Sequence, residues 1–178
     1  FSATVSFWLK ADMKNGLNEG FCDPIQITSK QWNDAALFVE FEKRGDKIPF
    51  RIGCYADMNV WNPKGIPFNE VPVEDRQLAA VENPPFEADK WTHVLVTLEN
   101  FNSKKPDGVA TLYFNGQQAT QLSPREPTFT WILEEATIAL GVLYVGGFDD
   151  LAIFDRALTA DEIRNVYNAK NGVKDLLK

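Results

Sequence analysis

The sequence predicts an all-β fold, an antiparallel sandwich of two sheets with one short helix near the C-terminal end. Short runs of β-branched and aromatic residues recur along the 178 residues and are separated by clusters of Gly, Pro, Asn and Asp. This is the pattern of strands joined by turns. Only residues 160–169 show convincing helical periodicity. Because strands do not alternate with helices, a parallel sheet is not expected.

The N-terminal third contains four expected strands. Alternation within residues 2–10 places every second side chain on the core face, here Val5, Phe7 and Leu9. Trp8 is then expected to cover the outside of the sheet or a neighbouring loop. Three further strands, separated by turns that contain Asn, Asp or Gly, are expected at residues 25–29, 37–42 and 50–55.

The long connection of residues 57–90 interrupts this pattern. It contains five prolines and several aromatic residues, Trp61 and Phe68 among them. Structureless loops beyond about 12–15 residues are uncommon in compact domains and tend to be functional or disordered. The aromatic residues disfavour disorder, so we expect an ordered surface lobe that lacks regular structure.

Strands return in the C-terminal half. Residues 92–98 form a nearly continuous apolar run, which is typical of a central strand. Asn115-Gly116 is a strong hairpin signal between strands at 110–114 and 117–122. Two more strands, at 138–145 and 149–154, are separated by Gly146-Gly147.

The one substantial helix is expected at residues 160–169. Thr159 and Glu162 have the spacing of a capping box, in which each side chain accepts a backbone N–H of the other residue. The apolar stripe of this helix consists of Ile163, Val166 and Tyr167. We expect the stripe to pack against one end of a sheet.

Four segments carry a resemblance to a known family. They read TVSFWLK (4–10), KWTHVLVT (90–97), ATLYFNG (110–116) and FDDLAIFDRALT (148–159). In this order they resemble the motifs of laminin-G-like domains of the concanavalin A-like lectin/glucanase superfamily. The resemblance implies a jelly-roll sandwich that spans residues 1–178 as one domain. It also implies export, with an extracellular, periplasmic or cell-surface location.

Composition and charge restrict the partners. The formal net charge of −7 argues against nucleic acid and anionic membranes, since both attract clustered Lys and Arg. No apolar run approaches the roughly 18 residues of a spanning helix, so membrane insertion is not expected. The chain starts at Phe1 without a leader pattern, and we expect it to be excised from a longer chain. Cys22 and Cys54 fit either one disulfide or two buried thiols.

Catalysis is not expected. His93 is the only histidine, and its place within a strand motif favours a structural hydrogen bond over a catalytic or zinc site. Retaining glucanases that resemble this chain place two carboxylates and an intervening aspartate on one strand, with nucleophile and acid roughly 5–5.5 Å apart. Glu40 and Glu42 share a strand face but lack the middle aspartate. The chain is therefore predicted not to be an enzyme.

Asp149 is the one expected metal ligand. It shares strand parity with Leu151 and Ile153, which places its carboxylate at the head of a face that otherwise belongs to the core. A buried carboxylate needs compensation from backbone N–H groups, an arginine or a hard cation. Structural calcium is the natural cation for oxygen ligands, and structural hydrogen bonding is the alternative.

The predicted function is that of a non-catalytic carbohydrate-binding or adhesion module of a larger exported protein, monomeric when isolated. Sugar rings present apolar faces that stack on exposed aromatic rings, while polar side chains bind the hydroxyls. In this chain the expected stacking and polar residues are Trp61, Trp131, Asn59, Asn62 and Asp57. The partners are a glycan or other domains of the parent protein. The alternatives are an interaction domain with no soluble ligand and a glycoside hydrolase.

Overall fold

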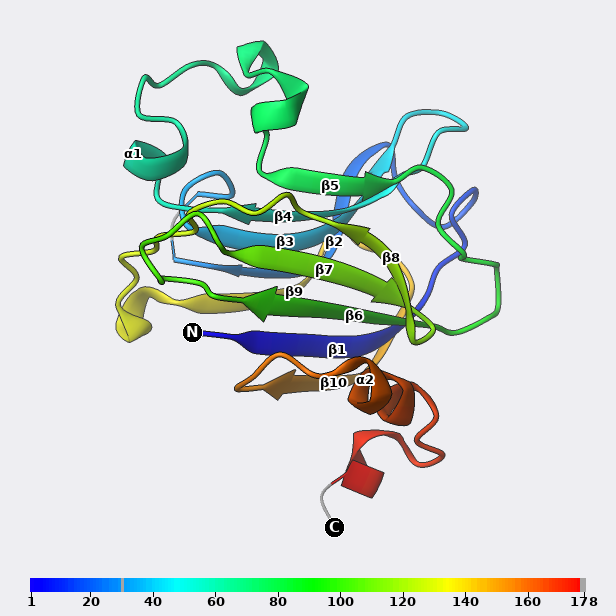
Figure 1. Cartoon of the computed structure of the whole chain (residues 1–178). Helices are drawn as coiled ribbons and strands as arrows, with labels where there is room; N and C mark the ends of the chain where they lie inside the picture. Colours follow the sequence, from blue (N-terminus) through cyan, green and yellow to red (C-terminus); the bar gives the residue numbers. More distant parts are fainter. Residues whose placement is uncertain (30, 177–178) are drawn as a thin grey trace.

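The computed structural model describes residues 1–29 and 31–176 and shows two five-stranded antiparallel sheets packed face to face (Figure 1). Sheet A contains, in spatial order, β10 (Gly147–Phe154), β1 (Ala3–Lys10), β6 (Thr92–Glu99), β7 (Val109–Phe114) and β8 (Gln117–Gln121). Sheet B contains β5 (Leu78–Val81), β4 (Phe50–Tyr55), β3 (Ala36–Lys43), β2 (Gly20–Thr28) and β9 (Thr137–Val142). The predicted sandwich is confirmed.

Helical structure is scarce in the part of the chain that the structure describes. It consists of α1 (Met58–Trp61), α2 (Ala160–Tyr167) and the short 3₁₀ turns η1 (Phe68–Glu70), η2 (Val73–Asp75), η3 (Leu133–Glu135) and η4 (Gly172–Leu176). Only α2 extends beyond five residues, as predicted. No helix within these described residues is both long and apolar enough to cross a membrane.

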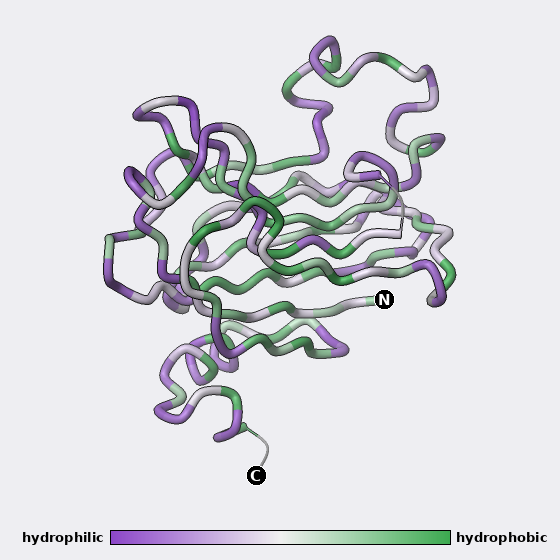
Figure 2. Tube along the Cα trace, turned by 180° about the vertical axis from the view of Figure 1, so that it is seen from behind, coloured by the Kyte–Doolittle hydropathy of each residue, from purple (hydrophilic) through white to green (hydrophobic). Residues whose placement is uncertain are grey.

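The core lies between the two sheets and contains the residues expected from strand alternation. Val5, Phe7 and Leu9 of β1 are all buried there. Hydrophobic residues follow the strands, whereas hydrophilic residues dominate many of the loops (Figure 2). Cys22 and Cys54 are both buried as free thiols. Because β3 lies between their strands, this structure contains no bridge between them.

Helix α2 packs on the outer face of sheet A rather than at its end. Ile163 and Val166 form a buried cluster with Leu95 of β6. The predicted capping box is present at Thr159 and Glu162. The stripe along one side of the helix therefore fixes the C-terminal segment to the sheet.

His93 has a structural role on the same face. It is fully buried, and its Nε2 lies 2.8 Å from Ser6 Oγ. The Trp8 ring covers it at a centroid distance of 5.1 Å. Burial lowers the pKa of His93 to about 4, so the imidazole is neutral at physiological pH. This agrees with the interpretation that His93 is a structural residue.

The prediction that residues 57–90 lack regular structure is wrong, because this segment contains short helical turns and a strand. Strand β5 pairs with β4 and forms an edge of sheet B. Alternation of Leu78-Ala79-Ala80-Val81 is weak because the alanines are small, so the sequence signal for this strand was poor. The preceding residues 57–77, called the lobe below, contain α1, η1 and η2 and rise above the sandwich (Figure 1).

Gly53 of β4 is required by the ring that lies over it. A Cβ atom at this position would meet ring atoms of Phe38 at 2.1–2.8 Å. Replacing Gly53 with alanine is expected to lower the free energy of unfolding by about 1–3 kcal/mol, the usual effect of overpacking. Thermal unfolding measures the effect, and the loss should be smaller in a Phe38→Ala background. An equal loss in both backgrounds would contradict the steric explanation.

Candidate binding site

The outer face of sheet B carries a groove of about 360 Å³. Strand alternation creates this face, because Ile52 and Cys54 point into the core while Arg51 and Tyr55 point away from it. We call this hollow the sheet B groove. Its lining combines aromatic rings with polar side chains, namely Phe21, Trp32, Phe38, Tyr55 and Phe68 with Asp23, Gln26, Glu40 and Arg51.

A β-bulge presents Asp23 to the groove. Cys22 pairs with Phe41 and Ile25 pairs with Val39, so two residues of β2 oppose the single residue Glu40 of β3. The second of these two is Pro24, which has no backbone N–H to donate and is tolerated inside a sheet at a bulge. In a regular strand, residues three positions apart point to opposite faces. Because the bulge inserts one residue between them, Cys22 and Ile25 both point into the core.

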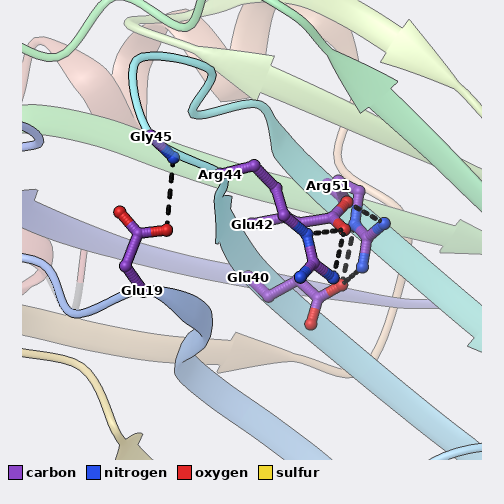
Figure 3. Close-up of polar contacts among 6 residues, drawn as sticks. All are labelled: Glu19, Glu40, Glu42, Arg44, Gly45 and Arg51. Carbon is purple, nitrogen blue, oxygen red and sulfur yellow. Dashed lines mark hydrogen bonds and ion pairs between the residues drawn. The ribbon is translucent and has the colours of Figure 1, made fainter.

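Arg51 is held by two glutamates of the adjacent strand (Figure 3). Its Nε donates to Glu40 Oε1 at 2.8 Å, its Nη2 donates to the same oxygen, and its Nη1 donates to Glu42 Oε2. Arg44 donates from Nε to Glu42 Oε1 at 3.1 Å. The guanidinium carbons of Arg51 and Arg44 lie 5.2 and 5.3 Å from the centroid of the Phe21 ring. Ion pairs and cation–π contacts thus fix one side of the groove.

Asp23 and Glu40 form a close carboxyl pair in the floor of the groove, within hydrogen-bonding reach of each other. Gln26 Nε2 donates to Asp23 Oδ2, whereas the buried Asp23 Oδ1 has no hydrogen-bond partner among the described residues. Burial, opposed by Arg51 and assisted by the nearby Asp23, raises the pKa of Glu40 to about 8. Burial also raises the pKa of Asp23. One proton is therefore retained on this pair near neutral pH.

Tyr55 forms the base of an aromatic cluster at the other end of the groove. Its ring is fully buried beneath the side chains of Trp32 and Trp61, whose centroids lie 5.6 and 4.9 Å away. Phe68 of the lobe makes an edge contact with Trp32 at 5.2 Å. The Tyr55 hydroxyl is buried without a hydrogen-bond partner among the described residues. The lobe therefore contributes one aromatic wall of the groove.

Comparison with known proteins establishes the family. A family model described as the concanavalin A-like lectin/glucanases superfamily matches residues 2–164. The chain belongs to this superfamily. A comparison with curated proteins finds no match.

Solved structures of this lectin-like fold resemble the chain at low sequence identity. The heptameric SAP-like pentraxin of Limulus polyphemus has a TM-score of 0.59 and 16% identity over 97% of this chain and 72% of its own. The CBM40 of the Ruminococcus gnavus IT-sialidase has a TM-score of 0.59 and 12% identity, and the match covers 93% of this chain and 82% of the CBM40. A third similar structure is domain 4 of AbnA, a GH43 extracellular arabinanase of Geobacillus stearothermophilus, solved with arabinotriose. It has a TM-score of 0.55 and 16% identity, and the match covers 92% of this chain and 65% of that chain. At these identities the likeness concerns the fold.

Three of the residues expected to bind sugar in this lectin-like domain have structural contacts. Trp61 is half-buried, packs on Tyr55 and donates from Nε1 to the Asn33 carbonyl at 2.8 Å. The buried Asn62 amide bonds both backbone groups of Ile66, at 2.8 and 3.0 Å. Asp57 is buried and accepts from Thr130 Oγ1 at 2.6 Å. These side chains hold the lobe together.

The other two expected residues lie on different segments of the chain. Asn59 is exposed on α1. Trp131 is half-buried and makes an edge contact with Phe129 at 5.3 Å. Of all five, only Trp61 and Asn62 line a common hollow, an open one of about 510 Å³ between the lobe and residues 124–126.

The expectation that Asp149 heads the core face is wrong. Asp149 is exposed, because the pairing of β10 with β1 shifts register between Ser6 and Trp8 and so interrupts the alternation. Asp150, at φ +55°, lies at this irregularity and accepts the Val173 N–H at 3.0 Å. Around Asp149 the described residues assemble no group of three or more metal-ligating side chains. The described acidic side chains around Asp149 therefore do not form a calcium site by themselves, and structural calcium stays a prediction.

Proposed function

We propose that this domain is a non-catalytic carbohydrate-binding module and that the sheet B groove is its binding site. The observation that carries the proposal is the combination of exposed aromatic rings and unpaired polar groups in one hollow. Phe21 and Trp32 are 46% and 45% exposed and line the same hollow, and an exposed apolar patch rimmed by polar groups is typical of a ligand or partner site. The apolar face of a sugar ring is a suitable partner for them.

The geometry supplies both parts of sugar recognition. The rings of Trp32 and Phe68 are held by edge contacts with each other and with Tyr55, so little side-chain freedom is lost when a ligand binds. Asp23 and Gln26 present carboxylate and amide groups in the same hollow. Aromatic rings bind the faces of the sugar and the polar groups bind its hydroxyls.

Glycoside hydrolysis fits the groove less well. Retaining enzymes need two carboxyl groups roughly 5–5.5 Å apart, and inverting enzymes need a wider separation of about 6.5–9.5 Å. Asp23 and Glu40 are within hydrogen-bonding reach of each other, and Glu40 and Glu42 both bind Arg51. This arrangement favours binding over catalysis. As part of the same proposal, the module belongs to a larger exported protein, as does the fold neighbour from the extracellular arabinanase.

A contact with another domain of the parent protein is a second candidate function. It is favoured by edge strand β9, where Ile138 and Leu140 are half exposed, because an exposed apolar edge strand is a ready interaction surface. Amide hydrogen exchange of β9 tests this in the isolated domain and in the complete parent protein. Slower exchange in the complete protein would support the contact, and equal exchange would contradict it.

Replacing Trp32 with alanine tests the proposed site. We expect the variant to lose at least about tenfold in affinity for any glycan that the domain retains on a glycan array, since one stacking ring contributes on the order of 1.4 kcal/mol. Trp91→Ala is the matched control, because Trp91 is 43% exposed but precedes β6 of sheet A. Both variants should unfold within a few degrees of the parent. Equal losses of binding would contradict the assignment of the groove.

A further inference from the structure

We propose that the sheet B groove selects uncharged sugars and rejects acidic ones. This inference rests on the proposed function and specifies its ligand class. Some polar groups of the groove are already paired with other groups of the protein, whereas others have no partner among the described residues. The inference follows from this difference.

The positive charge in the groove is already committed. Arg51 is the only cationic side chain among the lining residues that the structure describes. Its Nε and Nη2 donate to Glu40, its Nη1 donates to Glu42, and its side chain is only 14% exposed. A ligand carboxylate would have to displace a glutamate that is bound in place, which leaves that glutamate without its partner.

Both arginines at the groove are already paired. Asp23 and Glu40 line the groove and retain one proton between them near neutral pH, and Glu42 lies beside them on Arg51. Arg44, the next cation along the strand, is bound to Glu42 by an ion pair of 3.1 Å. A sugar carboxylate in this hollow would therefore be partly desolvated without a free cation among the described lining residues to compensate its charge.

An unoccupied polar group matches a neutral hydroxyl. Asp23 Oδ1 accepts no hydrogen bond from the described residues although Asp23 is only 6% exposed. A sugar O–H can donate to it, whereas a ligand carboxylate cannot. Leaving this oxygen unpaired is costly, and a sugar hydroxyl supplies the missing donor.

Matched sugar pairs test the selection. We would compare galactobiose with digalacturonate and methyl glucoside with methyl glucuronide, first on a glycan array and then by calorimetry. Each pair differs by its carboxylates, so its aromatic stacking is conserved. We expect the neutral member to bind at least about tenfold more tightly.

A variant with one carboxylate fewer should gain affinity for acidic sugars. Glu42→Gln removes one carboxylate and weakens the hold on Arg51 Nη1, so it should narrow the difference within each pair by increasing affinity for the acidic member. Glu99→Gln is the control, because Glu99 is exposed at the end of β6 in sheet A and changes the net charge equally. It should leave the difference unchanged.

The outcomes separate this inference from the proposed function. If the acidic sugar binds as tightly as the neutral one or more tightly, and Trp32→Ala abolishes that binding, the groove remains the binding site but the proposed preference for uncharged sugars is wrong. Binding that survives Trp32→Ala, or no binding to any array sugar, would overturn the proposed function and the inference with it.

Discussion

Replacing Arg51 with methionine is expected to cause a large loss of stability, about 3 kcal/mol at pH 9. Methionine is an unbranched side chain of similar length, but it lacks the guanidinium that binds Glu40 and Glu42 and lies over Phe21. Breaking a buried ion pair by removing one partner leaves the other charge uncompensated. For a domain of this size the melting temperature should fall by roughly 6–12 °C.

Arg44→Met provides a closely matched control. Arg44 also binds Glu42 and lies over Phe21, but its side chain is 61% exposed. An exposed ion pair contributes at most about 1 kcal/mol, so thermal unfolding should hardly change. The Arg51→Met loss should shrink at pH 6, where Glu40 retains its proton. Equal losses for the two variants would show that burial of Arg51 is not the cause.

Replacing Glu40 with glutamine is expected to make the domain less sensitive to alkaline pH. The pKa of Glu40 in the folded chain is about 8, against an ordinary value of 4.5, because the carboxyl is buried. The folded state therefore binds the proton more tightly than the unfolded state does. This contribution to stability is fully present below about pH 4.5 and is lost as the pH rises to about 8.

Glutamine resembles the protonated carboxyl at every pH and still accepts from Arg51. The variant's stability relative to the parent should therefore increase between pH 5 and pH 8 by roughly 3–4 kcal/mol, or on the order of 10 °C in melting temperature. Asp23, Glu42 and Arg51, the charged groups around Glu40, are present in both proteins. A difference that stays constant from pH 5 to pH 9 would show that Glu40 is charged throughout as the partner of Arg51.

The fold was predictable because local sequence patterns and core burial agree. Alternation along β1 identified Val5, Phe7 and Leu9, all of which are buried, and the Asn115-Gly116 turn and the capping box at Thr159 mark element ends that local chemistry determines. The shift in β10 was not predictable in this way. One extra residue changes the face of every residue before it, which is why Asp149 was assigned to the core.

The groove could be predicted only in part. Glu40 and Glu42 were expected to share a face, but their partner Arg51 lies on another strand, and the sequence does not state which residues pair across strands. Asp23 reaches the groove through a bulge whose only local signal is Pro24 within an apolar run. Trp32 was overlooked because it lies in the connection between β2 and β3. The expected Trp61 contributes by packing on Tyr55, behind the groove.

The most direct test of the central claim is a titration followed through the indole N–H resonances of the five tryptophans with a glycan that the domain retains. We predict that the resonance of Trp32, assigned from its alanine variant, shifts most. The resonance of Trp61, whose N–H is bound to the Asn33 carbonyl, should stay nearly constant. A shift of Trp61 without a shift of Trp32 would contradict the account and place the ligand in the hollow beside the lobe.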